Sequence, residues 1–230
     1  MAKQPFHISG RLHLSGSSRF IGDEAPLLNM LYAKFFFAPV AKAKILNLDL
    51  SEAQAFPGVH CVLGAKDIPG ENMIGHVIKD EPLFPEETIM FYYQPLAMVL
   101  AEDESIAEAA ISKIKLEYEE QKAVLEIEEA DALQDWYIPE RKIERGDLRL
   151  ALKESPHVLQ GKSYSGGQEH FYMESQRVRA IPTDHDLIHL LCATQSTMEV
   201  QEVVAHVLGI PAHRIAVEVP RLGGAFGGKE

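Results

Sequence analysis

Cysteine is scarce in this sequence: Cys61 and Cys192 are the two thiols among 230 residues. Two cysteines cannot build a disulfide framework, and their separation matches no zinc-binding spacing. Each lies in an apolar run, so we expect buried free thiols and a reducing compartment. The sequence also has no apolar N-terminal segment of the export type and no apolar run long enough to span a bilayer. We therefore expect a soluble, cytoplasmic chain that makes no membrane contact.

Basic residues are outnumbered as well: 22 Lys and Arg stand against 34 Asp and Glu, a formal net charge of −12. Because the phosphates of nucleic acids demand a basic face, this balance argues against a nucleic-acid partner. The pattern G-x-S-x-G of the nucleophile elbow is absent. The apolar content of 46% is ordinary and predicts a real core, in one large domain or two smaller ones.

Strand patterns dominate the first half of the chain. Apolar alternation or buried apolar runs predict strands over residues 27–40, 43–50, 60–64, 95–101 and 113–120. Ser51 is expected to cap a short helix, and Asp103 a helix over 104–113. The order strand–helix–strand predicts an α+β layer of about a hundred residues.

An acidic stretch, 127–145, then loses the alternation. We place a domain boundary there, which gives predicted domains over residues 1–130 and 131–230. Asp147 is expected to cap a helix over 148–155.

The second half again mixes strands and helices. Strands are predicted over residues 157–165, 177–183, 186–195 and 214–222. Ser196 and Glu199 form a capping box at the start of a helix with a buried valine stripe, and Gly209 is a natural stop for that helix.

Two histidines four residues apart, His185 and His189, raise the question of a metal site. On a helix they would share a face and could hold an ion. The surrounding apolar residues predict a strand, in which four residues span about 13 Å. One ion cannot bridge that distance, so a turn histidine and a core histidine are the favoured interpretation.

The last ten residues, RLGGAFGGKE, place four glycines around one phenylalanine. They match the phosphate-binding loop G-x-x-x-x-G-K-[ST] until Glu230, where a carboxylate replaces the hydroxyl that should ligate magnesium. The dinucleotide fingerprint is absent because Ala225 takes the place of its second glycine. The glycines can admit backbone amides close to a ligand, or they can make a tight turn. Phe226, a large apolar side chain between glycines, favours a ligand site.

Gln195 ends a predicted apolar strand and directly precedes a capped helix. In layered α/β structures such positions face ligand crevices. A side-chain amide there can donate to an oxo or carbonyl oxygen without adding charge. A polar loop residue is the plainer alternative, and the pattern alone favours it.

Taken together, these residues resemble the xanthine dehydrogenase family of molybdenum hydroxylases. The resemblance runs from about residue 10 to residue 230. Its marks are AKAKILNLDLSEAQAFPGV, YYQPLAMVLAED and KLEYEE in the first part, and GGQEHFYMESQ, ATQSTMEVQEVVAHVLGIPAHRIAVEV and RLGGAFGGKE in the second. Lys42 and Tyr93 depart from the usual pattern, in which histidine and glycine are common, but both lie in the first predicted domain.

The resemblance implies an α/β hammerhead domain followed by the start of a molybdopterin-binding α/β domain. It also implies an oxidoreductase of purine catabolism, which hydroxylates hypoxanthine or xanthine with oxygen taken from water. The cofactor would be molybdenum on molybdopterin, and the sequence leaves open whether the pterin carries a cytosine dinucleotide. Iron–sulfur (2Fe-2S) clusters and FAD would lie on partner subunits or domains.

Individual residues take roles by the same resemblance. Gln195 corresponds to the glutamine that hydrogen-bonds an oxygen ligand of molybdenum. Phe226 and Gly227 correspond to the loop whose backbone amides face the ligands of the metal, so Gln195, Phe226 and Gly227 are the expected cofactor contacts. Glu230 corresponds to the glutamate that binds the purine, which makes Gln195 and Glu230 the candidate catalytic residues.

Other functions remain open. An aldehyde or N-heterocycle hydroxylase of the same family would share Gln195 and Phe226, but an aldehyde-type site is expected to carry a hydrophobic residue at the position of Glu230. A non-catalytic binding or assembly module is a third alternative, because no catalytic base is recognisable. Members of the family continue well beyond the glycine loop. We therefore expect this chain to be part of a longer molybdenum subunit and to be inactive by itself.

Overall fold

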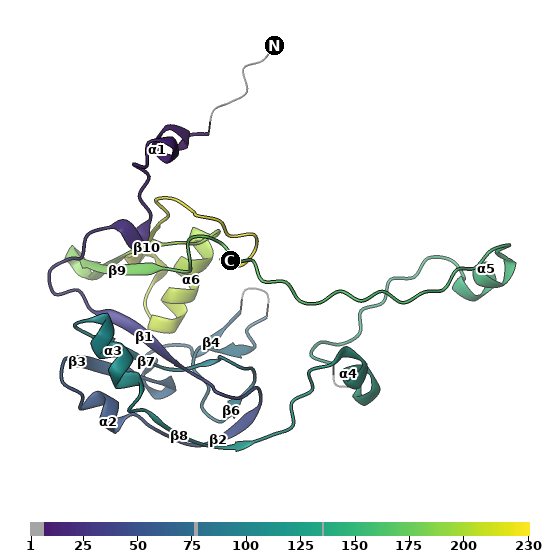
Figure 1. Cartoon of the computed structure of the whole chain (residues 1–230), viewed down its shortest axis with the longest axis horizontal. Coiled ribbons are helices and arrows are strands. Elements are labelled where there is room, and N and C mark those ends of the chain that lie inside the picture. The colour runs from purple at the N-terminus through teal and green to yellow at the C-terminus, as the bar shows by residue number, and fades with distance from the viewer. Residues whose placement is uncertain (1–6, 76–77, 135) are drawn as a thin grey trace, which may run out of the picture. The chain divides into compact units, whose positions relative to one another are not determined.

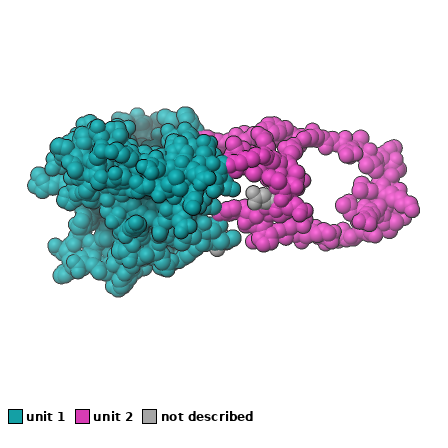
Figure 2. Space-filling model, turned by 90° about the horizontal axis from the view of Figure 1, so that it is seen from below, with its two compact units in different colours: residues 1–121, 170–230 teal, residues 122–169 magenta. Residues whose placement is uncertain are grey.

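The computed structural model describes residues 7–75, 78–134 and 136–230 (Figure 1). Helices and strands are mixed along the chain, which confirms the predicted α+β fold. The chain divides into two compact units, residues 1–121 with 170–230, and residues 122–169 (Figure 2).

The first unit contains a three-stranded antiparallel sheet with β7 at its centre. Strand β7 (Pro95–Ala101) pairs with β1 (Tyr32–Phe37) on one side and with β3 (Val59–Leu63) on the other. Most of β7 is buried, which explains why its sequence is a continuous apolar run instead of an alternating one. The strands predicted here are confirmed, although β1 is shorter than its predicted range.

Helix α3 (Glu104–Ile111) packs on β1 and β7 and closes the main core. Asp103 caps it as predicted, because its Oδ1 accepts a hydrogen bond from the Ser105 amide at 2.7 Å. Ala107 and Ala110 are completely buried, and the partly buried Ile106 packs against the same cluster. Small residues on the inner face let the helix lie close to the sheet.

A second antiparallel sheet has the order β6–β2–β8. Strand β2 (Ala43–Asp49) pairs with β6 (Thr88–Ile89) and β8 (Lys115–Glu120), and Ala43, Ile89 and Leu96 form a second buried cluster. The predictions for β2 and β8 are confirmed. The alternation of residues 113–120 predicts that Tyr118 faces inward together with Ile114 and Leu116, but Tyr118 is 37% exposed.

Short elements precede the first strand or lie between the strands of these sheets. They are helices α1 (Gly10–Leu14) and α2 (Ser51–Gln54), the pair β4 (Met73–Ile74) and β5 (Glu81–Pro82), and the 3-10 turns η1 (Ile21–Asp23) and η2 (Ala65–Asp67). The predicted cap at Ser51 is wrong by one residue: Ser51 is the first helical residue and Leu50 occupies the cap position. The Asp49 carboxylate takes over this role by accepting a hydrogen bond from the Ser51 amide at 2.9 Å.

A third sheet, of order β11–β10–β9, carries the C-terminal part of the first unit. Strand β10 (Leu187–Cys192) is antiparallel to β9 (Val178–Thr183) and parallel to β11 (Ile215–Glu218). The turns η3 (Asp184–Asp186) and η4 (Ala212–Arg214) precede β10 and β11. Helix α6 (Thr197–Leu208) makes the crossover that a parallel pair requires. The strands and the helix predicted here are confirmed, but the valine stripe of the helix is half-buried rather than buried.

Ser196 and Gly209 cap the two ends of α6 as predicted, but the Ser196 amide, which a complete capping box pairs with the Glu199 side chain, donates to Thr194 Oγ1 at 3.1 Å. Ser196 Oγ accepts a hydrogen bond from the Glu199 amide at 3.4 Å, and Gly209 follows the helix in the left-handed region at a φ of 64°. Ala205 packs with Leu190 and Ile215 in the core of this sheet. The helix start is therefore fixed directly after Gln195.

The second unit, residues 122–169, contains two helices of seven residues each, α4 (Ile127–Leu133) and α5 (Leu148–Glu154). Asp147 caps α5 as predicted, accepting hydrogen bonds from the Arg149 and Leu150 amides at 2.9 and 3.0 Å. Neither helix has a buried residue.

The strand predicted over residues 157–165 is wrong. This segment has no regular structure, and Leu159 is 99% exposed. A strand needs a hydrogen-bonding neighbour, and the described residues of 122–169 contain no other strand. Val158 and Tyr164 favour a strand, but no partner strand pairs with this segment.

Candidate functional site

Gln195 and the glycine loop, defined here as residues 221–229, meet at one edge of the third sheet. Gln195 follows the carboxyl end of β10, and the loop follows the carboxyl end of β11. Because these strands are parallel, their carboxyl ends lie at the same edge. The topology thus unites two segments that the sequence analysis could only consider separately.

Gln195 is attached to the loop by its backbone and by its side chain. Its backbone N–H donates to the Lys229 carbonyl at 2.7 Å, and its side-chain Oε1 accepts from the Gly227 backbone N–H at 2.9 Å. Thr194 Oγ1 donates to the same Lys229 carbonyl at 3.0 Å. The side-chain oxygen of Gln195 is therefore occupied. Its Nε2 donates to no acceptor within the described ranges, and the residue is exposed.

The loop has an unusual backbone around Phe226. Gly224, Phe226 and Gly227 have positive φ angles of 95°, 55° and 93°. Positive φ is easy for glycine and uncommon for phenylalanine, so Phe226 is held there by its surroundings. Its side chain is 75% exposed. Its backbone amide donates to no acceptor in the described part of the chain. This uncharged donor directly precedes Gly227, whose amide is bonded to Oε1 of Gln195.

Lys229 is directed into the protein and not toward a ligand. Its side chain is 0% exposed, and its Nζ lies 3.3 Å from Oε2 of Glu174 and 4.6 Å from the centre of the Tyr172 ring. A phosphate-binding loop presents this lysine to the phosphates. Since Lys229 is buried and paired with a carboxylate, the geometry argues against that interpretation.

Several residues that support the loop were missed by the sequence analysis. Tyr172 Oη and Gln176 Nε2 donate to the Gly228 carbonyl at 3.3 and 2.7 Å. Glu174 accepts from the Gly223 amide at 2.8 Å. These three lie in the stretch GGQEHFYMESQ, which has no strand or helix period. Its presence among the motifs of the resemblance was the one available signal.

Of the remaining predicted residues, Glu230 lies at this edge, whereas His185 lies at the amino end of β10 and His189 within the strand. Glu230 is exposed and directly follows Lys229, whose carbonyl is bonded to Gln195. His185 lies in the turn before β10 with a φ of 62°, and His189 lies in β10 with its Nε2 3.1 Å from Oε2 of Glu218. The described residues contain no group of three or more His, Cys, Asp or Glu side chains that could hold a metal.

Both cysteines are free, as predicted, but half-buried rather than buried. Burial raises the pKa of the Cys192 thiol, and the ammonium of Lys229 acts in the opposite direction. Burial also raises the pKa of the Cys61 thiol, and the negative charge of Asp67 adds to this shift. Neither thiol has the lowered pKa of a reactive cysteine.

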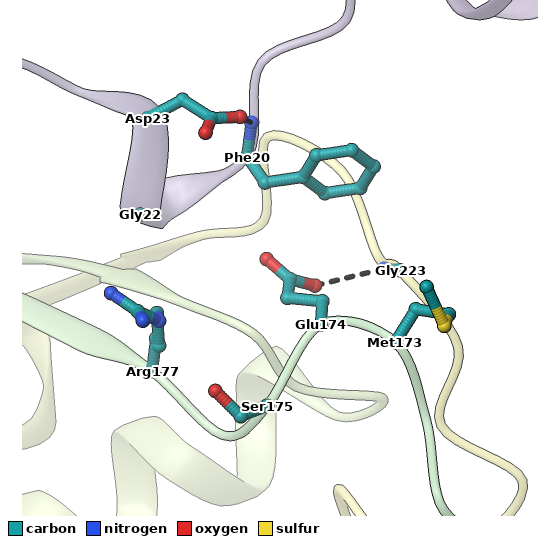
Figure 3. A pocket seen from close by; sticks show the side chains of 8 residues that line it. All are labelled: Phe20, Gly22, Asp23, Met173, Glu174, Ser175, Arg177 and Gly223. Atoms are coloured by element: carbon teal, nitrogen blue, oxygen red, sulfur yellow. Dashed lines mark hydrogen bonds between the residues drawn. The ribbon is translucent and has the colours of Figure 1, made fainter.

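A cavity lies at the beginning of the glycine loop (Figure 3). It is lined by Phe20, Gly22, Asp23, Met173, Glu174, Ser175, Arg177 and Gly223. It shares Glu174 and Gly223 with the loop and its support. None of the predicted site residues lines it, so the candidate site is the exposed edge formed by Gln195 and the glycine loop.

Comparisons with known proteins define the class of this architecture. Residues 15–122 match the family model described as the a/b hammerhead domain of aldehyde oxidase and xanthine dehydrogenase. Residues 131–230 match the model of a molybdopterin cofactor-binding domain. The chain thus combines the two modules of a molybdenum-cofactor protein.

Individual relatives narrow this class to a family. The chain is 38% identical over 225 residues to the xanthine dehydrogenase/oxidase of Gallus gallus and 38% identical over 226 residues to aldehyde oxidase 3 of Rattus norvegicus. Quinoline 2-oxidoreductase from Pseudomonas putida 86 has a similar structure, with a TM-score of 0.83 at 30% identity over 96% of this chain and 30% of that one. The chain belongs to the xanthine oxidase family.

The matched region is a small part of those relatives. The two alignments cover 97% of this chain but 16% and 17% of the full sequences. No helix in the described ranges is long and apolar enough to cross a membrane.

Proposed function

We propose that this chain forms part of the molybdenum site of an oxidoreductase that hydroxylates hypoxanthine or xanthine. The observation that carries the proposal is the attachment of Gln195 to the glycine loop. The Gly227 amide holds Oε1 of Gln195 at 2.9 Å, which leaves the Nε2 group as an outward donor. The family membership supports the same conclusion.

The residues present fit a cofactor that carries oxygen ligands. Gln195 Nε2 and the Phe226 amide are uncharged donors without an acceptor in the described chain. Gly224 and Gly227 place no Cβ beside them. When bound, molybdenum on molybdopterin supplies a two-electron acceptor and activates an oxygen derived from water. Gln195 and Phe226 would hold it directly, and Gly227 through its bond to Gln195 rather than through its own amide.

Gln195 would act as a preorganised donor. A hydrogen-bond donor that is already oriented stabilises developing negative charge without reorganising during the reaction. The bond from the Gly227 amide supplies this orientation in the structure. Because an amide adds no net charge, Gln195 would not disturb the charge balance of the cofactor.

Glu230 is the basis for proposing a purine substrate. A purine offers ring nitrogens and carbonyls to a carboxyl group, and such contacts can strengthen as negative charge moves onto the ring. An aldehyde offers no such edge, so a glutamate facing it would lose its hydration without compensation. Overall identity does not separate these substrates, since a xanthine dehydrogenase and an aldehyde oxidase are equally similar at 38%.

The wider setting of the enzyme is part of the same proposal. The substrate chemistry requires electrons to leave the site, and we assign this task to 2Fe-2S clusters and FAD on other domains or subunits. We keep the domain division near residue 130 and a cytoplasmic location, the latter from the two unpaired cysteines. The pterin would be bound largely by residues outside this chain, which spans 16–17% of the relatives named above.

The substrate proposal is tested by Glu230→Val in the complete enzyme. The variant should lower kcat/KM for hypoxanthine and xanthine and leave aldehyde turnover equal or higher. Glu202→Val, at an exposed position on α6, is a matched control that should change neither. Molybdenum content is measured in every preparation so that lost cofactor is not mistaken for lost recognition. A parallel loss for purines and aldehydes would contradict the role given to Glu230 and remove the basis for preferring a purine over the substrate of an aldehyde or N-heterocycle hydroxylase.

A further inference from the structure

One buried carboxylate, that of Glu174, is bonded to two residues of the glycine loop, Gly223 and Lys229. Its Oε2 accepts a hydrogen bond from the Gly223 amide at 2.8 Å, drawn as the dashed line in Figure 3. The same oxygen accepts from Lys229 Nζ at 3.3 Å. The Glu174 amide also donates to the Gly223 carbonyl at 3.1 Å. These contacts are made at Gly223 and Lys229, so they hold the loop on both sides of Phe226.

The pair formed by Glu174 and Lys229 is almost fully removed from water. The Lys229 side chain is 0% exposed and that of Glu174 is 7% exposed. Taking two charges out of water costs about as much as their attraction returns, so such a pair is a poor source of stability. The better attested use of a buried polar pair is to favour one conformation of the surrounding chain over several alternatives.

The conformation favoured here is that of the residues proposed to face the cofactor. The carbonyl of Lys229 accepts from the Gln195 amide at 2.7 Å, and Gln195 Oε1 in turn accepts from the Gly227 amide at 2.9 Å. A continuous series of contacts thus runs from Glu174 through Lys229 to Gln195 and returns to the loop. If Lys229 moves, the backbone amide of Gln195 loses its acceptor, and the Gln195 side chain is no longer held in this orientation.

We propose that Glu174 and Lys229 are positioning residues that set the shape of the glycine loop and thereby the orientation of the Gln195 side chain. Neither residue faces the cofactor. The consequence for the cofactor rests on the function proposed above, whereas the effect on the loop does not depend on it.

The sensitivity of the pair follows from its surroundings. Glu174 Oε1 is buried and has no hydrogen-bond partner in the described chain, so Lys229 provides the compensating charge. Replacing Lys229 alone would leave an uncompensated buried carboxylate, which is strongly destabilising. Replacing both partners removes both charges. The double variant therefore separates a change in the conformation of the glycine loop from a loss of stability of the folded chain.

The experiment compares backbone amide hydrogen exchange, followed by NMR, in the 230-residue chain and three variants. The variants are Lys229→Met, the double variant Glu174→Gln/Lys229→Met, and Glu174→Asp, which keeps the charge but shortens the reach. Lys115→Met is the matched control, because Lys115 makes an exposed ion pair with Glu52. Melting temperatures are recorded in parallel.

The double variant should melt close to the unmodified chain, while its Gly227 amide exchanges about tenfold faster or more. Glu174→Asp should also speed exchange at Gly227, and Lys115→Met should not. If Lys229→Met fails to fold, the other two variants carry the test. Gly227 exchange that stays at the control level in them would overturn the proposal. Because no cofactor is present, that result would leave the proposed function standing, and a failure of the Glu230 test would leave the ion pair's role standing.

Discussion

The Gly227 amide donates to Oε1 of Gln195 at 2.9 Å, so a loop residue determines which end of the Gln195 side chain is free. The two ends of an amide are chemically opposite, since the oxygen accepts and the NH2 group donates. A flip of the side chain would break this bond and place two donors against each other. The candidate site is therefore defined by a relationship between β10 and the loop after β11, and not by either segment alone.

Gly223→Ala should destabilise the chain by about 1–3 kcal/mol, as overpacking does. The added Cβ would lie 2.4 Å from Cβ of Glu174, which cannot move away without breaking its bonds to the loop. The free energy of unfolding is measured by urea denaturation. Gly161→Ala is the control, because a Cβ there meets nothing within 4 Å, and it should change the stability by less than about 0.5 kcal/mol. Equal effects at the two positions would contradict the packing described here.

Asp103 should make the stability of the first unit depend on pH. The hydrogen bonds from the Ser105 side chain and amide hold the pKa of the Asp103 carboxyl below its ordinary value of 3.8. A lowered folded-state pKa means that the carboxylate stabilises the fold fully above 3.8. This contribution is lost as the pH falls through the lower, folded-state value.

The test for Asp103 compares melting temperatures of the native chain and Asp103→Asn, which keeps an oxygen for the cap. The difference between the two proteins should be largest at neutral pH and shrink as the pH falls below 3.8. A difference that does not change with pH would show that the charge of Asp103 contributes nothing.

Residues 122–169 should be the first segment that proteases cleave in the isolated chain. This unit has no buried residue in either helix, and its Ile143 and Leu159 are 100% and 99% exposed. Cleavage follows local opening, which is easiest where few apolar contacts hold the backbone. Brief trypsin digestion followed by mass spectrometry should find early cuts near Arg141, Lys142 and Arg145. Early cuts inside β7 or β10 would contradict this order.

The sequence predicted the elements whose signals are local. The apolar run of β7, the cap at Asp103 and the stop at Gly209 each depend on residues within a few positions, and all three are confirmed. The parallel pairing of β10 and β11 was not predicted. It depends on register between distant segments, which no local pattern encodes.

Two misses have the same physical cause. Glu174 lies in a segment without periodicity, and its contacts with Gly223 and Lys229 are 49 and 55 positions away in sequence. The segment 157–165 contains residues that favour a strand, such as Val158 and Tyr164, but pairing also needs a neighbour at hydrogen-bonding distance. Local composition carries no information on either partner. The role of Gln195 was predicted in part: the sequence showed that Gln195 follows a strand, but it did not show the hydrogen bond to Gly227.

The central claim is that Gln195 serves as a fixed hydrogen-bond donor to the cofactor, and Gln195→Glu in the complete enzyme tests it most directly. The substitution keeps an oxygen for the Gly227 amide and removes the Nε2 donor, but it also adds a negative charge. Gln195→Ala, which removes the donor without adding charge, is therefore assayed beside it. With molybdenum content matched to the native enzyme, kcat for xanthine should fall about 10²-fold, as for the loss of one oxyanion-type donor. An unchanged kcat at matched molybdenum content would contradict the account and make Gln195 a polar residue at the end of a strand.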